Sequence, residues 1–255
     1  MKKALLIIDR GSREVDVREE LEDICSIAKR KGEYDYADYC FLEVLPPYIE
    51  EGIKKCLENG ADLITIMPYF LYPGMKLKDS VKKSAEIAKI RNLKLVIAKP
   101  LSYHSMMIEV IIDRVNQLKD EKKIHYPNSE CDILVIGHGS SDKNARDALL
   151  YTVSSLKPFY RKVAFCFLEL DAPNIDEGIK NVLQDNPKII LLIPYFLHKG
   201  AHIKRDVIND VNSALEKYSF KNVFMAKHLG VDEKLVDLVL ERTREVEQRR
   251  IVFSG

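Results

Sequence analysis

The 255-residue sequence lacks a strong charge of one sign and any long apolar run. Its 40 basic residues nearly balance 39 acidic ones, leaving a net charge of +1, so no overall field attracts nucleic acid. The apolar run after Lys2 and Lys3 is broken at Asp9, too early for a signal peptide, and no later run reaches a membrane-spanning length. We therefore expect a soluble globular protein with no nucleic-acid or membrane partner.

Cysteine is also scarce. There are five, an odd number, and no two form a Cys-x-x-Cys pair. This usage argues against a disulfide scaffold and against a cysteine zinc site, and it suits a reducing compartment, so we expect a cytoplasmic protein. The residues are Cys25, Cys40, Cys56, Cys131 and Cys166.

What the sequence does contain is a long internal repeat. Pro-Tyr-Phe-Leu begins at Pro68 and again at Pro194, 126 residues later, and Phe-Leu-Glu recurs at the same offset, ending at Glu43 and Glu169. A repeat of this length indicates two copies of one fold. We expect domains at 1–120 and 131–255, joined by a polar linker at 121–130.

Each half alternates apolar strands with helical segments over short connections, which predicts an α/β fold with a parallel four-stranded sheet flanked by helices. Proline is well tolerated in the first turn of a helix, so helices are expected to start at Pro46-Pro47 and at Pro173. The expected strands are 5–8, 37–42, 63–67, 93–98, 133–136, 163–168, 189–193 and 222–226. The expected helices are about 14–31, 46–58, 77–90, 105–118, 144–156, 173–183, 202–218 and 232–249.

Three chemically active residues of the second half each follow a predicted strand: His138, Glu169 and His202. The carboxyl ends of parallel strands meet at one edge of a sheet, where ligands bind. Two imidazoles and a carboxylate suit a divalent transition metal and leave positions open for a substrate. The spacing matches no zinc finger or His-Glu-x-x-His helix, so the prediction depends on the fold.

These motifs resemble those of the sirohydrochlorin cobalto- and ferrochelatases, a class II family with chelatase-like domains. They are Gly137-His138-Gly139-Ser140, Phe167-Leu168-Glu169, Pro194-Tyr195-Phe196-Leu197 and Gly200-Ala201-His202. The resemblance covers both halves and implies that His138 and His202 bind the incoming metal with Glu169 beside them. It also implies that one histidine accepts pyrrole protons. One departure is Ser141, which stands where the family often has arginine.

The resemblance further implies a sirohydrochlorin-type tetrapyrrole as partner and a divalent metal, Fe²⁺, Co²⁺ or Ni²⁺, as substrate, with no permanently bound cofactor. The choice of metal and pathway, sirohaem or cobalamin, stays open because these ligands accept all three ions. A monomer and a homodimer are both compatible with the sequence. The predicted substrate contacts are Ser140, Leu197, His198, Lys199, Gly200 and Ala201, although the family pattern does not require His198. Nearby cations that could hold substrate carboxylates are Lys143, Arg146, Lys199, Lys204 and Arg205.

Two other functions remain open. A non-catalytic carrier of tetrapyrrole or metal could use the same fold. A histidine phosphatase is suggested by Gly137-His138-Gly139, but the arginine that phosphate capture would want is missing beside the histidine.

The first half retains Glu43 but has Arg10 and Lys76 where the second has histidines. Neither cation can donate a lone pair to a metal at neutral pH. We therefore predict a degenerate metal site in the first half, with the active site in the second.

Overall fold

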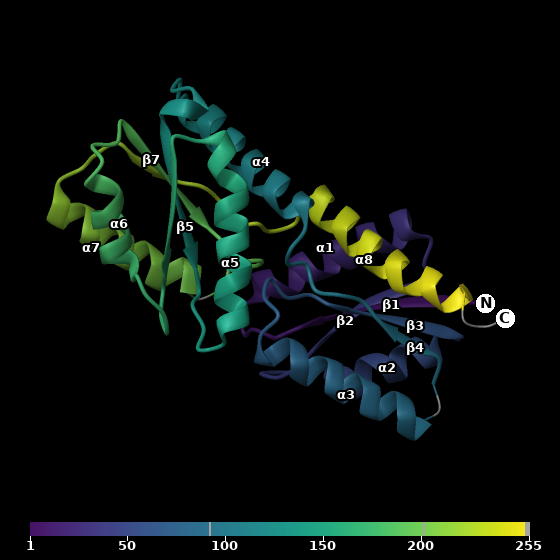
Figure 1. The fold of residues 1–255 in the computed structure, drawn as a ribbon. Helices are drawn as coiled ribbons and strands as arrows, with labels where there is room; N and C mark the ends of the chain where they lie inside the picture. The colour runs from purple at the N-terminus through teal and green to yellow at the C-terminus, as the bar shows by residue number, and fades with distance from the viewer. Residues whose placement is uncertain (92, 201, 253–255) are drawn as a thin grey trace. The chain divides into compact units, whose positions relative to one another are not determined.

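The computed structural model describes residues 1–91, 93–200 and 202–252, and only the backbone for 202–204 and 249–252. The chain forms two compact units, shown in Figure 1. Unit 1 comprises 1–102 together with 231–255, and unit 2 comprises 103–230.

Unit 1 contains a parallel sheet in the order β2-β1-β3-β4, with helices on both faces. Helices α1 and α8 cover one face, and α2 and α3 cover the other. The bounds are β1 (Lys3–Asp9), α1 (Val15–Gly32), β2 (Tyr36–Phe41), α2 (Ile49–Glu58), β3 (Leu63–Pro68), α3 (Met75–Arg91), β4 (Leu95–Ile97) and α8 (Glu233–Val252).

Unit 2 repeats this architecture with the parallel order β6-β5-β7-β8. Helices α4 and α5 cover one face, and α6 and α7 cover the other. The bounds are α4 (Ser105–Lys122), η1 (Asn128–Glu130), β5 (Cys131–Gly137), α5 (Lys143–Leu156), η2 (Lys157–Phe159), β6 (Lys162–Phe167), α6 (Ile175–Leu183), β7 (Ile189–Pro194), the π-helix η3 (His202–Val207), α7 (Ile208–Tyr218) and β8 (Val223–Met225). The two parallel four-stranded sheets confirm the predicted fold class.

The compact units differ from the expected 1–120 and 131–255 by one helix each. Helix α4 follows β4 in the chain but packs on β7 and α5, whereas α8 follows β8 and packs on β3, β4 and α1. The two sequence repeats therefore exchange their last helices. The expected linker at 121–130 is also partly regular, because α4 continues to Lys122 and η1 begins at Asn128.

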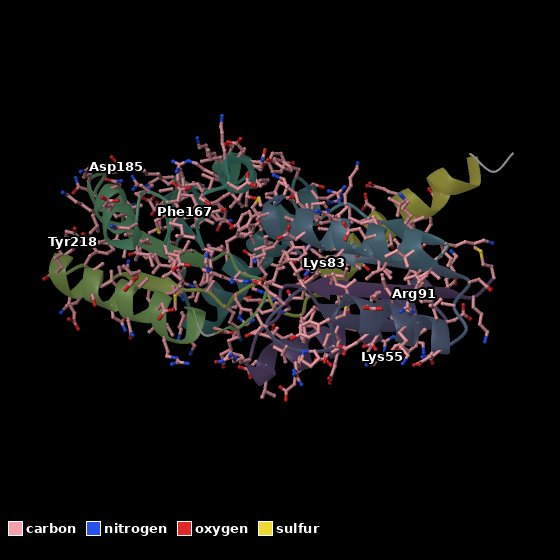
Figure 2. All side chains as sticks on the ribbon, turned by 90° about the horizontal axis from the view of Figure 1, so that it is seen from below. Lys55, Lys83, Arg91, Phe167, Asp185 and Tyr218 are labelled. Carbon is pink, nitrogen blue, oxygen red and sulfur yellow. The ribbon has the colours of Figure 1, made fainter. Side chains whose placement is uncertain are left out.

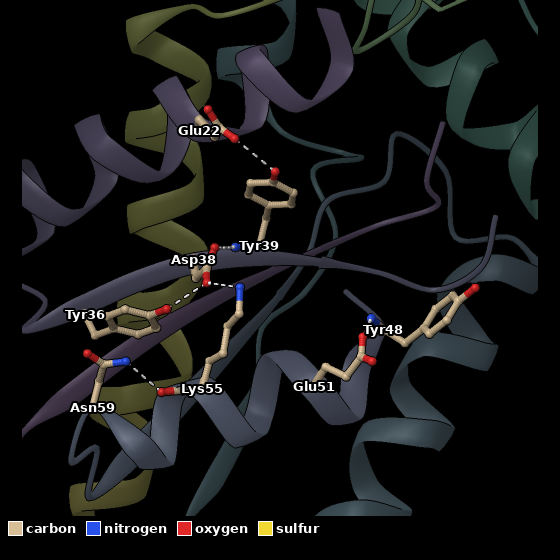
Figure 3. Close-up of polar contacts among 8 residues, drawn as sticks. All are labelled: Glu22, Tyr36, Asp38, Tyr39, Tyr48, Glu51, Lys55 and Asn59. Atoms are coloured by element: carbon tan, nitrogen blue, oxygen red, sulfur yellow. Dashed lines mark hydrogen bonds and ion pairs between the residues drawn. The ribbon is translucent and has the colours of Figure 1, made fainter. Parts of the chain in front are cut away.

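Polar side chains attach helices α1 and α2 to strand β2, as Figure 3 shows. Asp38 accepts hydrogen bonds from Tyr36 Oη (2.7 Å) and Lys55 Nζ (3.4 Å), and the latter comes from α2. Tyr39 Oη donates to Glu22 of α1 at 3.2 Å. In unit 2, Tyr218, labelled in Figure 2, ends α7 and donates to Asp176 of α6 at 3.2 Å.

The expectation that prolines start two helices was wrong. Helix α2 begins at Ile49 after a cis Pro46-Pro47 peptide, and α6 begins at Ile175 after a cis Ala172-Pro173 peptide. The carbonyls of Pro47 and Pro173 instead accept hydrogen bonds from the last strand residues, Phe41 N (2.7 Å) and Phe167 N (2.8 Å). These prolines therefore belong to the connections that end β2 and β6.

The sheets form the centre of each core, with β1, β3, β5 and β7 almost entirely buried. All five cysteines are buried free thiols. Among the described residues, no helix combines the length and apolar composition that a transmembrane segment needs.

Candidate active site at the carboxyl edge of the unit 2 sheet

The loop after β5 passes very close to the loop after β6. Two backbone hydrogen bonds join them, from Leu168 N to Gly137 O (2.9 Å) and from Glu169 N to His138 O (3.0 Å). Gly139 adopts φ +92°, and a Cβ there would lie 1.7 Å from the carbonyl oxygen of Glu169. Only glycine permits this approach, which places His138 and Glu169 side by side.

His138 and Glu169 form the centre of the candidate site. His138 Nε2 lies 3.4 Å from Glu169 Oε1, and the two side chains are 26% and 47% exposed. His138 Nδ1 lies 3.3 Å from the carbonyl of Gly139, and when Nδ1 donates this bond, Nε2 presents its lone pair. Among the described residues, Glu169 Oε2 has no hydrogen-bond or ion-pair partner. The pair thus brings an imidazole ring and a carboxylate together at one point of the sheet edge.

The loop after β7 forms the next part of the site. Tyr195 is 2% exposed and its hydroxyl contacts Thr152 Oγ1 at 3.3 Å, so it belongs to the core. Phe196 is half-buried, and its ring meets the ring of His138 edge to face, with 6.3 Å between the centroids. Of the two aromatic residues that follow β7, Phe196 is therefore the one that contacts the candidate site.

The predicted substrate contacts differ in how accessible they are. Lys199 is exposed and His198 and Gly200 are half-buried, but Leu197 is only 9% exposed. The Ser140 hydroxyl accepts a hydrogen bond from Asp142 N at 3.0 Å, in the turn before α5. Leu197 and Ser140 therefore stabilise the loops, and Lys199 is the most accessible of the predicted contacts that the structure describes.

The remaining predicted site residues come from positions 201 to 204. Ala201 and the side chains of His202 and Lys204 lie outside the described residues. Within the part of the chain that the structure describes, no cluster of three or more His, Cys, Asp or Glu side chains could hold a metal ion. Two of the three predicted ligands, His138 and Glu169, are thus together, and His202 stays a prediction.

Arg146, one of the candidate substrate cations, has structural contacts of its own. Its Nη1 forms an ion pair with Asp171 and donates to Ala172 O at 2.9 Å. Its guanidinium carbon also lies 5.5 Å from the centroid of the Phe167 ring. Arg146 therefore holds the connection after β6, where the predicted site residue Glu169 lies.

The equivalent edge of unit 1 shows how the repeat has changed. Arg10 Nε lies 3.0 Å from Glu43 Oε1, and Lys76 Nζ lies 2.7 Å from Glu43 Oε2. The hydrogen bond from Lys76 is the main cause that keeps the pKa of Glu43 below its ordinary value; burial opposes it, and Arg10 adds to it. Gly11, at φ +103°, lies against the Glu43 carbonyl just as Gly139 lies against that of Glu169. The backbone geometry is kept, but both carboxylate oxygens already have cationic partners.

Comparison with known proteins agrees with this architecture. The CbiX family model matches twice, at residues 4–118 and 132–246. A sirohydrochlorin cobaltochelatase of Priestia megaterium is 28% identical over 95% of this chain and 79% of its own length. A sirohydrochlorin ferrochelatase of the same organism is 24% identical over 94% of this chain and 89% of its own.

The fold is shared with a solved structure, SirB from Bacillus subtilis with Fe³⁺, at a TM-score of 0.82 and 24% identity over 96% of this chain and 95% of that one. The two family-model matches together span most of the sequence and coincide with its two repeats. The chain belongs to the CbiX family.

Proposed function

We propose that this protein is a chelatase that inserts a divalent metal, Fe²⁺ or Co²⁺, into sirohydrochlorin, for sirohaem or cobalamin synthesis. The observation that carries the proposal is the 3.4 Å separation between His138 Nε2 and Glu169 Oε1 at the carboxyl edge of the unit 2 sheet. The family match and the relatives named as sirohydrochlorin chelatases support the substrate.

The reaction exchanges two pyrrole protons for one divalent ion. His138 and His202 bind the ion through imidazole nitrogens, with Glu169 as the third ligand, and this set leaves coordination positions for the ring nitrogens. After the ion passes to the ring, His138 accepts a pyrrole proton, because imidazole is the side chain that gains and loses a proton near physiological pH. Glu169 then stabilises the imidazolium, and solvent takes up the protons.

Sirohydrochlorin carries carboxylates around its rim, and the loop after β7 supplies a cation to meet them. Lys199 is exposed and next to half-buried His198 and Gly200, so its ammonium can pair with a substrate carboxylate. Ser140, Leu197 and Ala201 complete the predicted contact surface through their loops. The metal is a substrate here, and the protein keeps no permanent cofactor.

The protein works in the cytoplasm as a monomer or homodimer, without nucleic acid or membrane. The support for this location is that all five cysteines are free thiols, as expected in a reducing compartment.

A steady-state assay tests the function. Sirohydrochlorin and Fe²⁺ or Co²⁺ are mixed with the protein, and insertion is followed by the absorption of the ring. We expect clear acceleration over the uncatalysed reaction, and a loss of about 100-fold or more in Glu169→Gln, the lower range for a positioned proton-transfer partner.

The matched control is Glu43→Gln, the same change at the equivalent position of unit 1, which should keep near-normal turnover. A carrier would bind ring or metal without turnover. No acceleration with either metal, or equal losses in the two variants, would contradict the proposal.

A further inference from the structure

Among the described side chains, each of the two exchanged helices carries one buried arginine, and the two arginines stand 128 residues apart, at the same place in each helix. Arg114 of α4 is 8% exposed and Arg242 of α8 is 7% exposed. A buried guanidinium is costly unless its donors are satisfied, so the partners of these two side chains indicate what each one holds.

Arg114 holds the loop between β8 and α8. Its Nε donates to His228 O at 3.0 Å and to Leu229 O at 3.2 Å, and its Nη2 donates to the same Leu229 carbonyl. Its Nη1 donates to Gln117 Oε1 at 2.9 Å on the same helix. The planar fork of arginine fits two neighbouring carbonyls in a way that a single ammonium cannot.

The loop held by Arg114 in turn holds the loop after β7. Leu229 N donates to Phe196 O and Gly230 N donates to Leu197 O, both at 3.0 Å. Phe196 is the residue whose ring contacts His138, and Leu197 begins the predicted substrate loop. Hydrogen bonds through the peptide groups of residues 228–230 therefore connect Arg114 to Phe196 and Leu197, and the Phe196 ring contacts His138.

We propose that Arg114 is a positioning residue for the metal site. By fixing the carbonyls of residues 228 and 229, it fixes the amides that hold Phe196 and Leu197, and thereby the orientation of the His138 ring. The inference rests on the proposed function and deepens it. Removing a group that orients a metal ligand typically weakens metal binding by about 10- to 100-fold, and we expect a loss in that range.

Unit 1 provides a matched control. Arg242 Nε donates to Pro100 O at 3.1 Å and its Nη2 to Ser102 O at 3.0 Å, and Leu101 N donates to Phe70 O at 3.2 Å. This arginine clamp is similar but not identical, since Arg242 binds the carbonyls of residues 100 and 102 and Arg114 binds those of 228 and 229. The loop that Arg242 holds leads to Lys76 and to the edge where Glu43 already has cationic partners. Loss of this clamp should loosen unit 1 and leave the metal site of unit 2 intact.

The test compares Arg114→Gln with Arg242→Gln in the full chain. Hydrogen exchange of the Leu229 and Gly230 amides reports on the clamp, and titration with Co²⁺ alone reports on the site. We expect Arg114→Gln to lose protection at both amides and to bind Co²⁺ about 10- to 100-fold more weakly. Arg242→Gln should keep the wild-type protection of both amides and the wild-type affinity for Co²⁺.

A weakening of Co²⁺ binding in both variants, or in neither while the wild type binds, would overturn the inference. If Arg114→Gln fails to fold, Arg114→Lys serves in its place, since it keeps the charge but loses the fork, and the same two readouts decide. Absence of Co²⁺ binding in the wild type would instead count against the proposed function, and the exchange data would still decide whether Arg114 fixes the loop.

Discussion

Replacing His138 with alanine should reduce the rate of metal insertion into sirohydrochlorin by roughly 10²- to 10⁴-fold, the usual contribution of a positioned proton-transfer group. The same change also removes one of the proposed metal ligands, so the upper part of this range is expected. The fold should survive, because the side chain is 26% exposed and lies at a loop at the sheet edge. Steady-state kinetics and a thermal melt of the same preparation measure the two effects.

His125→Ala is the control for this change. His125 is an exposed histidine of the same unit, in the connection between α4 and β5, at the opposite end of the sheet from the loop after β5. It should keep normal turnover. Near-normal turnover in His138→Ala would remove His138 from the mechanism, and a large fall in the melting temperature would show that its role is structural.

Placing two histidines at the carboxyl edge of the unit 1 sheet should create a second metal site. The double change Arg10→His with Lys76→His replaces both cations that now occupy the oxygens of Glu43, at 3.0 and 2.7 Å, with imidazoles. The backbone is already suited to the change, since Gly11 and Gly139 make the same close approach to the glutamate carbonyl. We expect bound Co²⁺ to rise from one to two ions per chain in equilibrium dialysis, because neutral imidazole donates the lone pair that neither cation can.

The matched control is Arg10→Ala with Lys76→Ala, which removes the same charges without adding ligands. It should stay near one ion per chain. A second ion in this control would mean that Glu43 alone binds metal once its cationic partners are removed. If the histidine variant binds no second ion, the missing histidines do not explain why unit 1 lacks a metal site.

The candidate site could be anticipated from the sequence because its position follows from strand ends. The apolar run ending at Gly137 and the run ending at Phe167 pair as neighbours, so the residues after them meet at one edge. Phe196 could not be distinguished from Tyr195, because two adjacent aromatic residues after a strand carry no signal of which one turns inward.

The exchange of α4 and α8 could not be anticipated. Both helices follow the last strand of their repeat and both repeats are copies of one fold, so each helix suits either sheet. The arginine clamps were equally hidden, because Arg114 and Arg242 look like surface cations of charged helices. Both arginines bind backbone carbonyls, which every residue has, so no residue type in the sequence identifies the partners. The helix starts predicted at Pro46-Pro47 and Pro173 were wrong for the same reason. The carbonyls of Pro47 and Pro173 accept backbone hydrogen bonds that form only when the chain folds.

The most direct test of the central claim is a crystal structure of the protein soaked in Co²⁺, with the ion located by its anomalous scattering. The predicted result is one ion per chain, bound to unit 2 by His138 Nε2, Glu169 and the side chain of His202, with none beside Glu43. An ion at Glu43 in the unaltered protein, or an ion in unit 2 that does not contact His138, would contradict it.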